Sequence, residues 1–168
     1  HGHNLCWVSA NPEWLDSVIT KTNAAHYLSD HVTKVVARYK GKIESWDVVN
    51  EPLDSRSSRP DLLKEGIWSN LLGPLYIDVA FHAAAAADPS ALRVLNIYEV
   101  EQDYSMAAKM RTATVALVKQ LISRGVPIQA IGLESHLDGT GSLARTGRQQ
   151  FLQQLRDLGM QILITECD

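Results

Sequence analysis

The sequence predicts an α/β fold built of parallel strands and helices, a (β/α)8 TIM barrel of which about five βα units are present. Short apolar runs alternate with amphipathic stretches along the 168 residues. Polar and ionisable residues follow the ends of these runs. No run leads into a G-x-G-x-x-G or Walker-type phosphate loop, which disfavours the other common parallel fold, the doubly wound sheet.

Five apolar runs predict buried strands. Each run is short and is bounded by polar residues, Gly or Pro, as is typical of a parallel strand that is covered on both faces. The predicted strands span residues 4–8, 43–49, 92–98, 130–135 and 161–166.

The first predicted helix precedes the second strand. Its apolar residues recur at helical spacing, at Val32, Val35, Val36 and Tyr39. Ser29 or Asp30 is expected to cap its start, and Gly41 is expected to end it.

Three more helices are expected between the remaining strands. The second begins at Pro74, a residue favoured in the first helical turn, and ends at Asp88. The third spans residues 106–124, and the fourth runs from Thr146, as its cap, towards Gly159. The order βαβαβαβαβ predicts one domain over residues 1–168, with no internal boundary.

Charge and composition exclude several classes of function. The net charge of −3 offers no basic field for nucleic acid or for an anionic membrane surface. No apolar run reaches the roughly 18 residues of a membrane span, and no signal peptide pattern occurs in this segment. Cys6 and Cys167 lack the spacing of metal ligands. We therefore expect no cofactor, no bound metal and no obligate protein partner.

Two glutamates stand where strands end. Glu51 follows the second run and Glu166 closes the fifth, so in a barrel both project into one cleft. Two carboxyl groups across a cleft are what glycoside hydrolysis requires, one as proton donor and one as an ionised group. Other polar or aromatic residues share these strand ends, namely His3, Trp7, Asn50, Asn96, Tyr98, Glu134, His136 and Asp168.

Four motifs in order resemble glycoside hydrolase family 10, the (β/α)8-barrel endo-1,4-β-xylanases. They are HGHNLCW (1–7), WDVVNE (46–51), SHL (135–137) and ITECD (164–168). Residues 73–96 also resemble the family's segment that leads into its fifth strand. The resemblance covers essentially the whole chain and implies a partial catalytic domain, from strand 3 through strand 7 of the barrel.

The resemblance implies a retaining endo-1,4-β-xylanase that acts on xylan or xylooligosaccharides. Glu51 would be the acid/base and Glu166 the nucleophile of a double displacement. Retention requires the two carboxyl groups to be about 5–5.5 Å apart.

The remaining roles are also implied by the resemblance. Asn50 would bind the sugar 2-hydroxyl, and the substrate would also meet His3, Trp7, Tyr98 and His136. The residues expected to support the nucleophile and its neighbours are Glu134, Asp168 and Asn96, with His136 and Asp168 orienting Glu166.

Glu134 departs from the family pattern, which usually has Gln at this position. A third carboxylate beside the nucleophile is expected to raise the pKa of Glu166. One alternative is therefore a homologue that binds xylan but is catalytically impaired. A second alternative is a metal-dependent barrel amidohydrolase, with His1 and His3 as an H-x-H pair and His136 as a third ligand.

The length of the chain indicates that only part of the barrel is present. A (β/α)8 barrel takes roughly 200 to 250 residues, and five strands do not close one. We expect a segment of a longer xylanase, secreted or periplasmic by family resemblance, and we expect the isolated fragment to be inactive.

Overall fold

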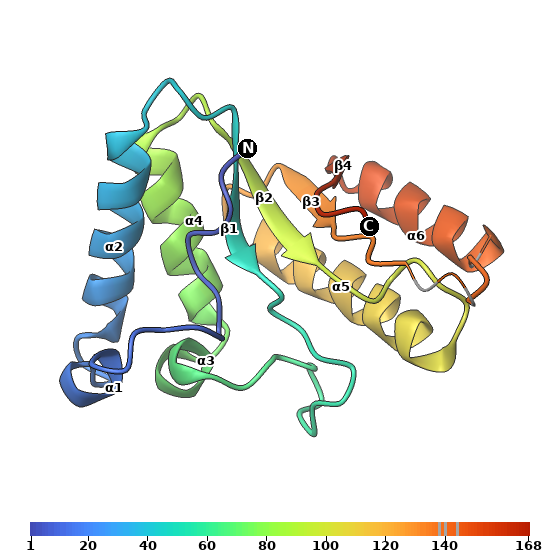
Figure 1. Ribbon diagram of the computed structural model, residues 1–168, viewed down its shortest axis with the longest axis horizontal. Helices are drawn as coiled ribbons and strands as arrows, with labels where there is room; N and C mark the ends of the chain where they lie inside the picture. Colours follow the sequence, from blue (N-terminus) through green and yellow to red (C-terminus); the bar gives the residue numbers. More distant parts are fainter. Residues whose placement is uncertain (138, 140, 144) are drawn as a thin grey trace.

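The computed structural model describes residues 1–137, 139, 141–143 and 145–168, and its described residues form a four-stranded parallel sheet (Figure 1). The strands are β1 (Ser45–Asn50), β2 (Leu92–Ile97), β3 (Ala130–Leu133) and β4 (Gln161–Ile164), and they lie side by side in chain order. The register places Asn50 opposite Asn96 and Asn96 opposite Gly132. Residues at the carboxyl ends of neighbouring strands therefore form a row.

Helices connect the strands. Their bounds are α1 (Leu15–Val18), α2 (Ala24–Arg38), α3 (Ile67–Leu72), α4 (Leu75–Ala87), α5 (Ser105–Ser123) and α6 (Arg145–Asp157). In Figure 1, α2 lies beside α4 at one end of the sheet, and α5 lies beside α6 at the other. Within the described residues, no helix combines the length and apolarity needed to cross a membrane.

The run at residues 4–8 does not form the predicted strand. It lies along β1, where the Gly2 amide donates to the Ser45 carbonyl at 2.8 Å, and isolated bridges pair Gly2 with Trp46 and Trp7 with Asn50. Between these bridges the N-terminal segment advances five residues, from Gly2 to Trp7, whereas β1 advances four. One extra residue in the N-terminal segment therefore interrupts the pairing. The segment still brings His3 and Trp7 alongside β1.

The predicted start of the first helix was also wrong. The helix α2 begins at Ala24, and Ser29 and Asp30 lie inside it. The buried stripe continues towards the N-terminus through Ala24 and Leu28, both fully buried, so core packing extends the helix past the expected cap. Helices α4, α5 and α6 lie within two residues of their predicted bounds, with Thr146 inside α6, whereas the short helices α1 and α3 were not predicted.

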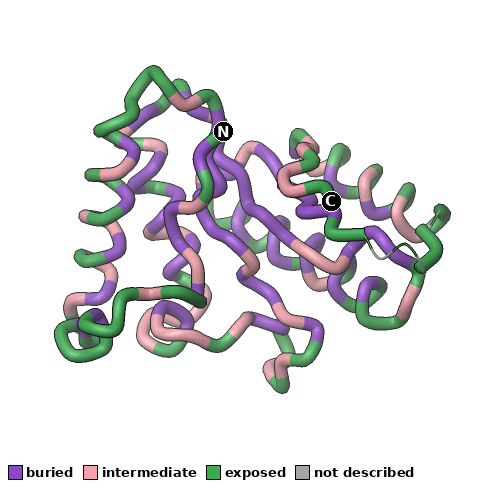
Figure 2. Tube along the Cα trace, in the orientation of Figure 1, coloured by how far each residue is buried: buried purple, intermediate pink, exposed green. Residues whose placement is uncertain are grey.

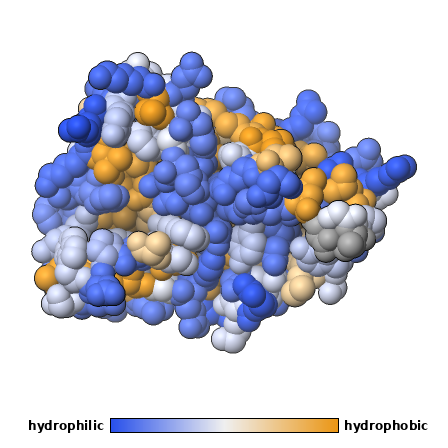
Figure 3. Space-filling model, viewed as in Figure 1, coloured by the Kyte–Doolittle hydropathy of each residue, from blue (hydrophilic) through white to orange (hydrophobic). Residues whose placement is uncertain are grey.

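Burial is greatest at β1, β2 and β3, and it declines at β4 (Figure 2). All six residues of β1 are buried, whereas Ile164 at the end of β4 is 60% exposed. The surface in Figure 3 is mainly hydrophilic but includes separate hydrophobic patches. Among the described residues, no strand pairs with the outer edge of β4.

Candidate active site

The ends of the four strands bring the candidate residues together. Glu51 directly follows β1, Asn96 lies one residue before the end of β2, Glu134 directly follows β3, and Glu166 lies two residues beyond β4. The row of parallel strands thus presents three carboxyl groups and an amide at one edge of the sheet.

Three residues just beyond the strands adopt left-handed backbone conformations. Their φ angles are 47° at Glu51, 56° at Glu99 and 59° at Ser135. Such values are uncommon for residues other than Gly and are concentrated at functional sites. The chain therefore turns abruptly after β1, β2 and β3, directly at the candidate site.

The side-chain amide of Asn96 links the strand ends. Its Nδ2 donates to Glu166 Oε1 at 2.7 Å, to Asn50 Oδ1 at 2.8 Å and, more weakly, to Glu134 Oε1 at 3.3 Å. Its Oδ1 accepts a hydrogen bond from Thr165 Oγ1 at 2.6 Å. Asn96 is fully buried, so this network fixes its orientation and connects β1, β2, β3 and the residues that follow β4.

Gly132 leaves the space that this amide occupies. A Cβ atom at Gly132 would lie 2.2 Å from Asn96 Oδ1 and 2.8 Å from Thr165 Cγ2. Gly inside a strand commonly marks such a close approach. The lack of a side chain at this position is therefore part of the site.

Glu51 is paired with a lysine that the sequence did not suggest. The carboxylate of Glu51 forms an ion pair with the ammonium of Lys64, and both side chains are less than one-fifth exposed. The ammonium also lies 5.2 Å from the centre of the Tyr98 ring. Lys64 comes from the loop after β1, at a position that no motif or periodicity distinguishes.

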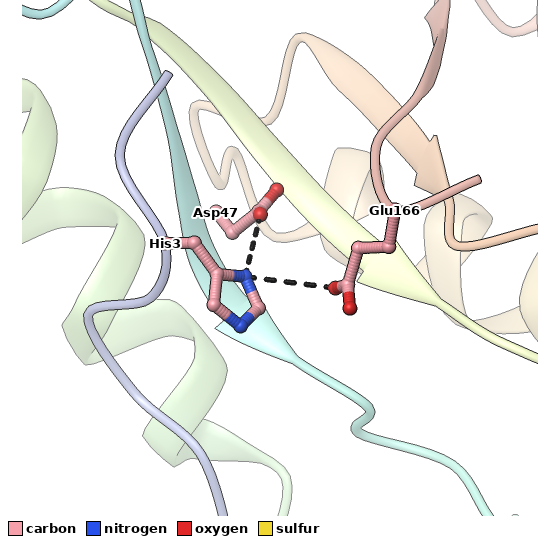
Figure 4. Close-up of side chains that lie close together, drawn as sticks. All are labelled: His3, Asp47 and Glu166. Atoms are coloured by element: carbon pink, nitrogen blue, oxygen red, sulfur yellow. Dashed lines mark hydrogen bonds and ion pairs between the residues drawn. The ribbon is translucent and has the colours of Figure 1, made fainter. Parts of the chain in front are cut away.

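Glu166 faces two imidazoles. His136 Nε2 lies 3.4 Å from Glu166 Oε2, and His136 Nδ1 is bonded to Asp168 Oδ1 at 2.8 Å. This hydrogen bond to Asp168 is the main cause that raises the pKa of His136, with the charges of Asp168 and Glu166 acting in the same direction. On the other side, His3 Nδ1 lies 3.6 Å from Glu166 Oε1 (Figure 4).

Asp47, which was not predicted as a site residue, holds His3 and His1. Its Oδ2 is bonded to His3 Nδ1 at 2.9 Å (Figure 4). The same oxygen is bonded to His1 Nε2 at 2.8 Å. Burial raises the pKa of Asp47, while the hydrogen bond from His3 opposes that shift. The available signal in the sequence was a charged residue inside an apolar strand, since a buried carboxylate requires partners.

Glu134 is the most deeply buried of the three carboxyl groups, at 3% exposure. Burial raises the pKa of Glu134 to about 8, and the charges of Glu166 and Glu51 add to the effect. Near neutral pH, Glu134 is therefore largely a neutral carboxylic acid.

Trp7 and Tyr98, the two aromatic residues predicted for the site, lie beside different neighbours of Glu51. Trp7 is half-buried beside Asn50, with which it forms the isolated bridge. Tyr98 is half-buried beneath Lys64, and burial is the main cause that raises its pKa to about 12. Both lie next to residues that flank Glu51.

By distance alone, two side-chain groups among the described residues could hold a metal ion. They are His3, Asp47 and Glu166, and Glu134, His136 and Glu166, with ligand atoms within 4.8 Å of one another in each group. The amidohydrolase hypothesis required His1, His3 and His136, which form no such group in the described chain. Hydrogen bonds and ion pairs within the carboxylate network account for both groups.

The arrangement provides two carboxyl groups in contrasting settings. Glu51 lies beside an ammonium group, while Glu166 lies beside an amide donor and two imidazoles. Both are partly accessible to a ligand, with side-chain exposures of 17% and 27%. One group can therefore exchange a proton while the other stays ionised and acts as a nucleophile or base.

Comparisons with known proteins agree on one family. The sequence profile described as "Glycosyl hydrolase family 10" matches residues 1–168. Endo-1,4-beta-xylanase 3 of Hypocrea jecorina is 38% identical over 169 residues, covering 99% of this chain and 46% of its own length. Endo-1,4-beta-xylanase B of Thermotoga neapolitana is 36% identical, covering 100% of this chain and 46% of its own.

Solved structures give the same result. Native xylanase 10B of Thermotoga maritima superposes with a TM-score of 0.85 at 34% identity, covering 98% of this chain and 48% of its own. Xylanase 10B of Thermotoga petrophila RKU-1, in complex with xylobiose, superposes with a TM-score of 0.87 at 34% identity, covering 100% and 49%. The chain thus spans about half the length of the relatives it matches.

Proposed function

Because this chain belongs to glycosyl hydrolase family 10, we propose that the protein is an endo-1,4-β-xylanase that hydrolyses the xylan backbone with retention of configuration. The observation that carries the proposal is the Asn96 amide, which ties Glu166 to Asn50, the last residue of β1 and the chain neighbour of Glu51. The xylanase names of the relatives, and the xylobiose complex of one of them, support xylan or xylooligosaccharides as the substrate.

In the first step, a carboxylate oxygen of Glu166 attacks the anomeric carbon while the protonated form of Glu51 gives its proton to the leaving glycosidic oxygen. The ion pair of Glu51 with Lys64 corresponds to the ionised form that this step produces. The amide of Asn96 and the imidazole of His136 stabilise Glu166 in the ionised form that this attack requires. The products are a glycosyl ester of Glu166, ionised Glu51 and the released aglycone.

In the second step, ionised Glu51 takes a proton from water as the water oxygen attacks the same carbon. The bond to Glu166 breaks, and both carboxyl groups return to their starting states. Lys64 is suited to this step, because its ammonium compensates the charge of ionised Glu51. By family resemblance, Asn50 binds the 2-hydroxyl of the sugar, and His3 and Trp7 form part of the wall of its site.

The test uses the whole encoded protein, meaning these 168 residues with whatever flanks them at their source. Replacing Glu166 with Ala should abolish turnover of every xyloside, since no other group forms the ester. Glu51→Ala should still release the phenol from aryl β-xylobiosides with good leaving groups, because that step needs little protonation. The glycosyl-enzyme should then accumulate for lack of a base.

Added azide separates the two roles. It should restore turnover of Glu51→Ala and give a β-configured glycosyl azide, while it should not restore Glu166→Ala in this way. A different result, in which both variants lose activity equally on all substrates and azide has no effect, would show that the roles are misassigned.

The two alternative functions give different outcomes in the same protein. A catalytically impaired homologue would bind xylooligosaccharides without turnover. A metal-dependent hydrolase would lose its activity in a chelator, whereas the proposed xylanase should retain it. Calorimetric binding of xylotriose and reducing-sugar release, each with and without chelator, separate the three cases.

A further inference from the structure

Glu134 is a buried carboxyl group that the two chemical steps do not use. It comes directly after β3, between the strands that hold Asn96 and Glu166. Its side chain faces the same donors as the proposed nucleophile, which gives it a means of acting on Glu166.

Two donors are shared between Glu134 and Glu166. The Nδ2 of Asn96 lies 2.7 Å from Glu166 Oε1 and 3.3 Å from Glu134 Oε1. The Nε2 of His136 lies 3.4 Å from Glu166 Oε2 and 3.5 Å from Glu134 Oε2. One oxygen from each carboxyl group lies within 4.8 Å of the other. An ionised Glu134 would therefore compete for both donors and would repel Glu166.

Charges around Glu134 come from several elements. Glu166 after β4 and Glu51 after β1 disfavour its ionised form, whereas His136 after β3 and Lys64 from the loop after β1 favour it. Asn96 on β2 is neutral. Burial and the two glutamates prevail and raise the pKa of Glu134 to about 8.

We propose that Glu134 is a positioning residue that must be protonated for Glu166 to keep both of its donors, so that its ionisation switches the site off at alkaline pH. The proposal rests on the role of Glu166 in the proposed function. With Glu134 neutral, the stronger hydrogen bond from Asn96 goes to Glu166, and the weaker one goes to an uncharged oxygen.

The test is Glu134→Gln in the whole encoded protein, because Gln has a similar shape and cannot ionise. The substrate is an aryl β-xylobioside with a good leaving group, so that loss of the Glu51 proton has little influence on the first step. The kcat/KM of the wild-type protein should fall about tenfold between pH 7 and pH 9, and that of Glu134→Gln should stay within about threefold. Near pH 6 the two should agree within about threefold.

The direction of the shift distinguishes Glu134 from His136. Glu134 is one of the charges that raise the pKa of His136, so if His136 alone set the alkaline limb, removing Glu134 would move that limb to lower pH. The proposal requires a move to higher pH. Glu65→Gln, an exposed glutamate beside Lys64, is the matched control for loss of one negative charge and should leave the limb in place.

A second readout does not depend on activity. In protein carrying 13C-labelled glutamate, the carboxyl resonance that disappears in Glu134→Gln should titrate near pH 8. A midpoint below pH 5, an unchanged alkaline limb, or a Glu134→Gln variant that is folded but weak at pH 6 would each overturn the proposal. Wild-type protein that cleaves no xyloside at any pH would instead overturn the proposed function, whatever the titration shows.

Discussion

Among the described residues, Asp168 reaches the proposed nucleophile through an imidazole. It holds His136 Nδ1, and the other nitrogen of His136 faces Glu166. Because Asp168 is the main cause of the raised pKa of His136, the imidazolium persists to higher pH than an ordinary histidine. The contribution of the imidazolium to the free energy of unfolding is therefore fully present below about pH 6.5, and it is lost as pH rises through the raised pKa of His136.

Asp168→Asn should lower the pKa of His136 and so reduce the positive charge beside Glu166 at neutral pH. We expect kcat/KM to fall about two- to threefold at pH 7 and to be nearly unchanged near pH 5.5, where His136 stays protonated in both proteins. Stability should change by less than about 1 kcal/mol, since both side chains are largely exposed.

Histidine proton resonances and a pH profile measure the two effects of Asp168→Asn. The control is Asp157→Asn, which removes an exposed aspartate at the end of α6. An unshifted His136 resonance in Asp168→Asn, or an equal loss of activity at all pH values, would contradict this coupling.

At the scale of the elements, β3 contributes to the site mainly through Gly132, which has no side chain and so leaves room for the Asn96 amide. Gly132→Ala would place a methyl group into Asn96 Oδ1 and Thr165, both held by hydrogen bonds. The Asn96 amide must then rotate or move, which disturbs its bond to Glu166. We expect kcat to fall about a hundredfold, as misplacement of catalytic groups by about 1 Å can cause.

Gly139→Ala is the matched control for Gly132→Ala, because a methyl group there meets no atom of the described residues within 4 Å. Circular dichroism and xylooligosaccharide kinetics on both variants provide the measurement. Normal kcat in a folded Gly132→Ala protein would show that the close approach at β3 is not needed for the reaction.

The elements differ in how far the sequence could predict them. The periods of helices α4 to α6 and the buried runs of β1 to β4 are local patterns, and they located these elements closely. The mismatch between residues 2–7 and β1 depends on pairing between two segments, so apolar content alone predicted a strand there. The early start of α2 depends on core packing at Ala24 and Leu28.

The residues of the candidate site also differ in how far the sequence could predict them. Glu51 and Glu166 could be proposed from the sequence because both lie close after apolar runs or at their ends, and because their resemblance to family motifs suggested roles. Lys64 could not, because the loop that brings it to Glu51 has no periodicity. The raised pKa of Glu134 depends on burial and on the charges of Glu166 and Glu51 at two other strand ends, which no single segment contains.

At the scale of the whole molecule, the four strands form part of a (β/α)8 barrel, as in the family members with solved structures. The outer edge of β4 is unpaired among the described residues, and Ile164 on β4 is 60% exposed. Such edges promote association between chains. The proposed nucleophile lies just beyond this least-covered strand.

We therefore predict that the 168 residues produced alone aggregate or melt without cooperativity and do not hydrolyse xylan. Activity should appear when the chain replaces its counterpart in xylanase B of Thermotoga neapolitana, which aligns with all of it. Light scattering, calorimetry and xylobiose release are the measurements. A monomeric chain of 168 residues that melts cooperatively and releases xylobiose at rates typical of enzymes would refute the prediction.

The left-handed backbone at Glu51, Glu99 and Ser135 limits how the thermal stability of this protein can be raised. An L-residue in this conformation costs roughly 1–2 kcal/mol, and Gly would avoid that cost. Engineering for heat tolerance would therefore favour Gly at all three positions. At Glu51 that choice would remove the proposed acid/base. Stability therefore favours Gly at this position, whereas the proposed reaction requires Glu. Glu99 and Ser135 carry no proposed chemical role, and a search for thermostable variants has more freedom there.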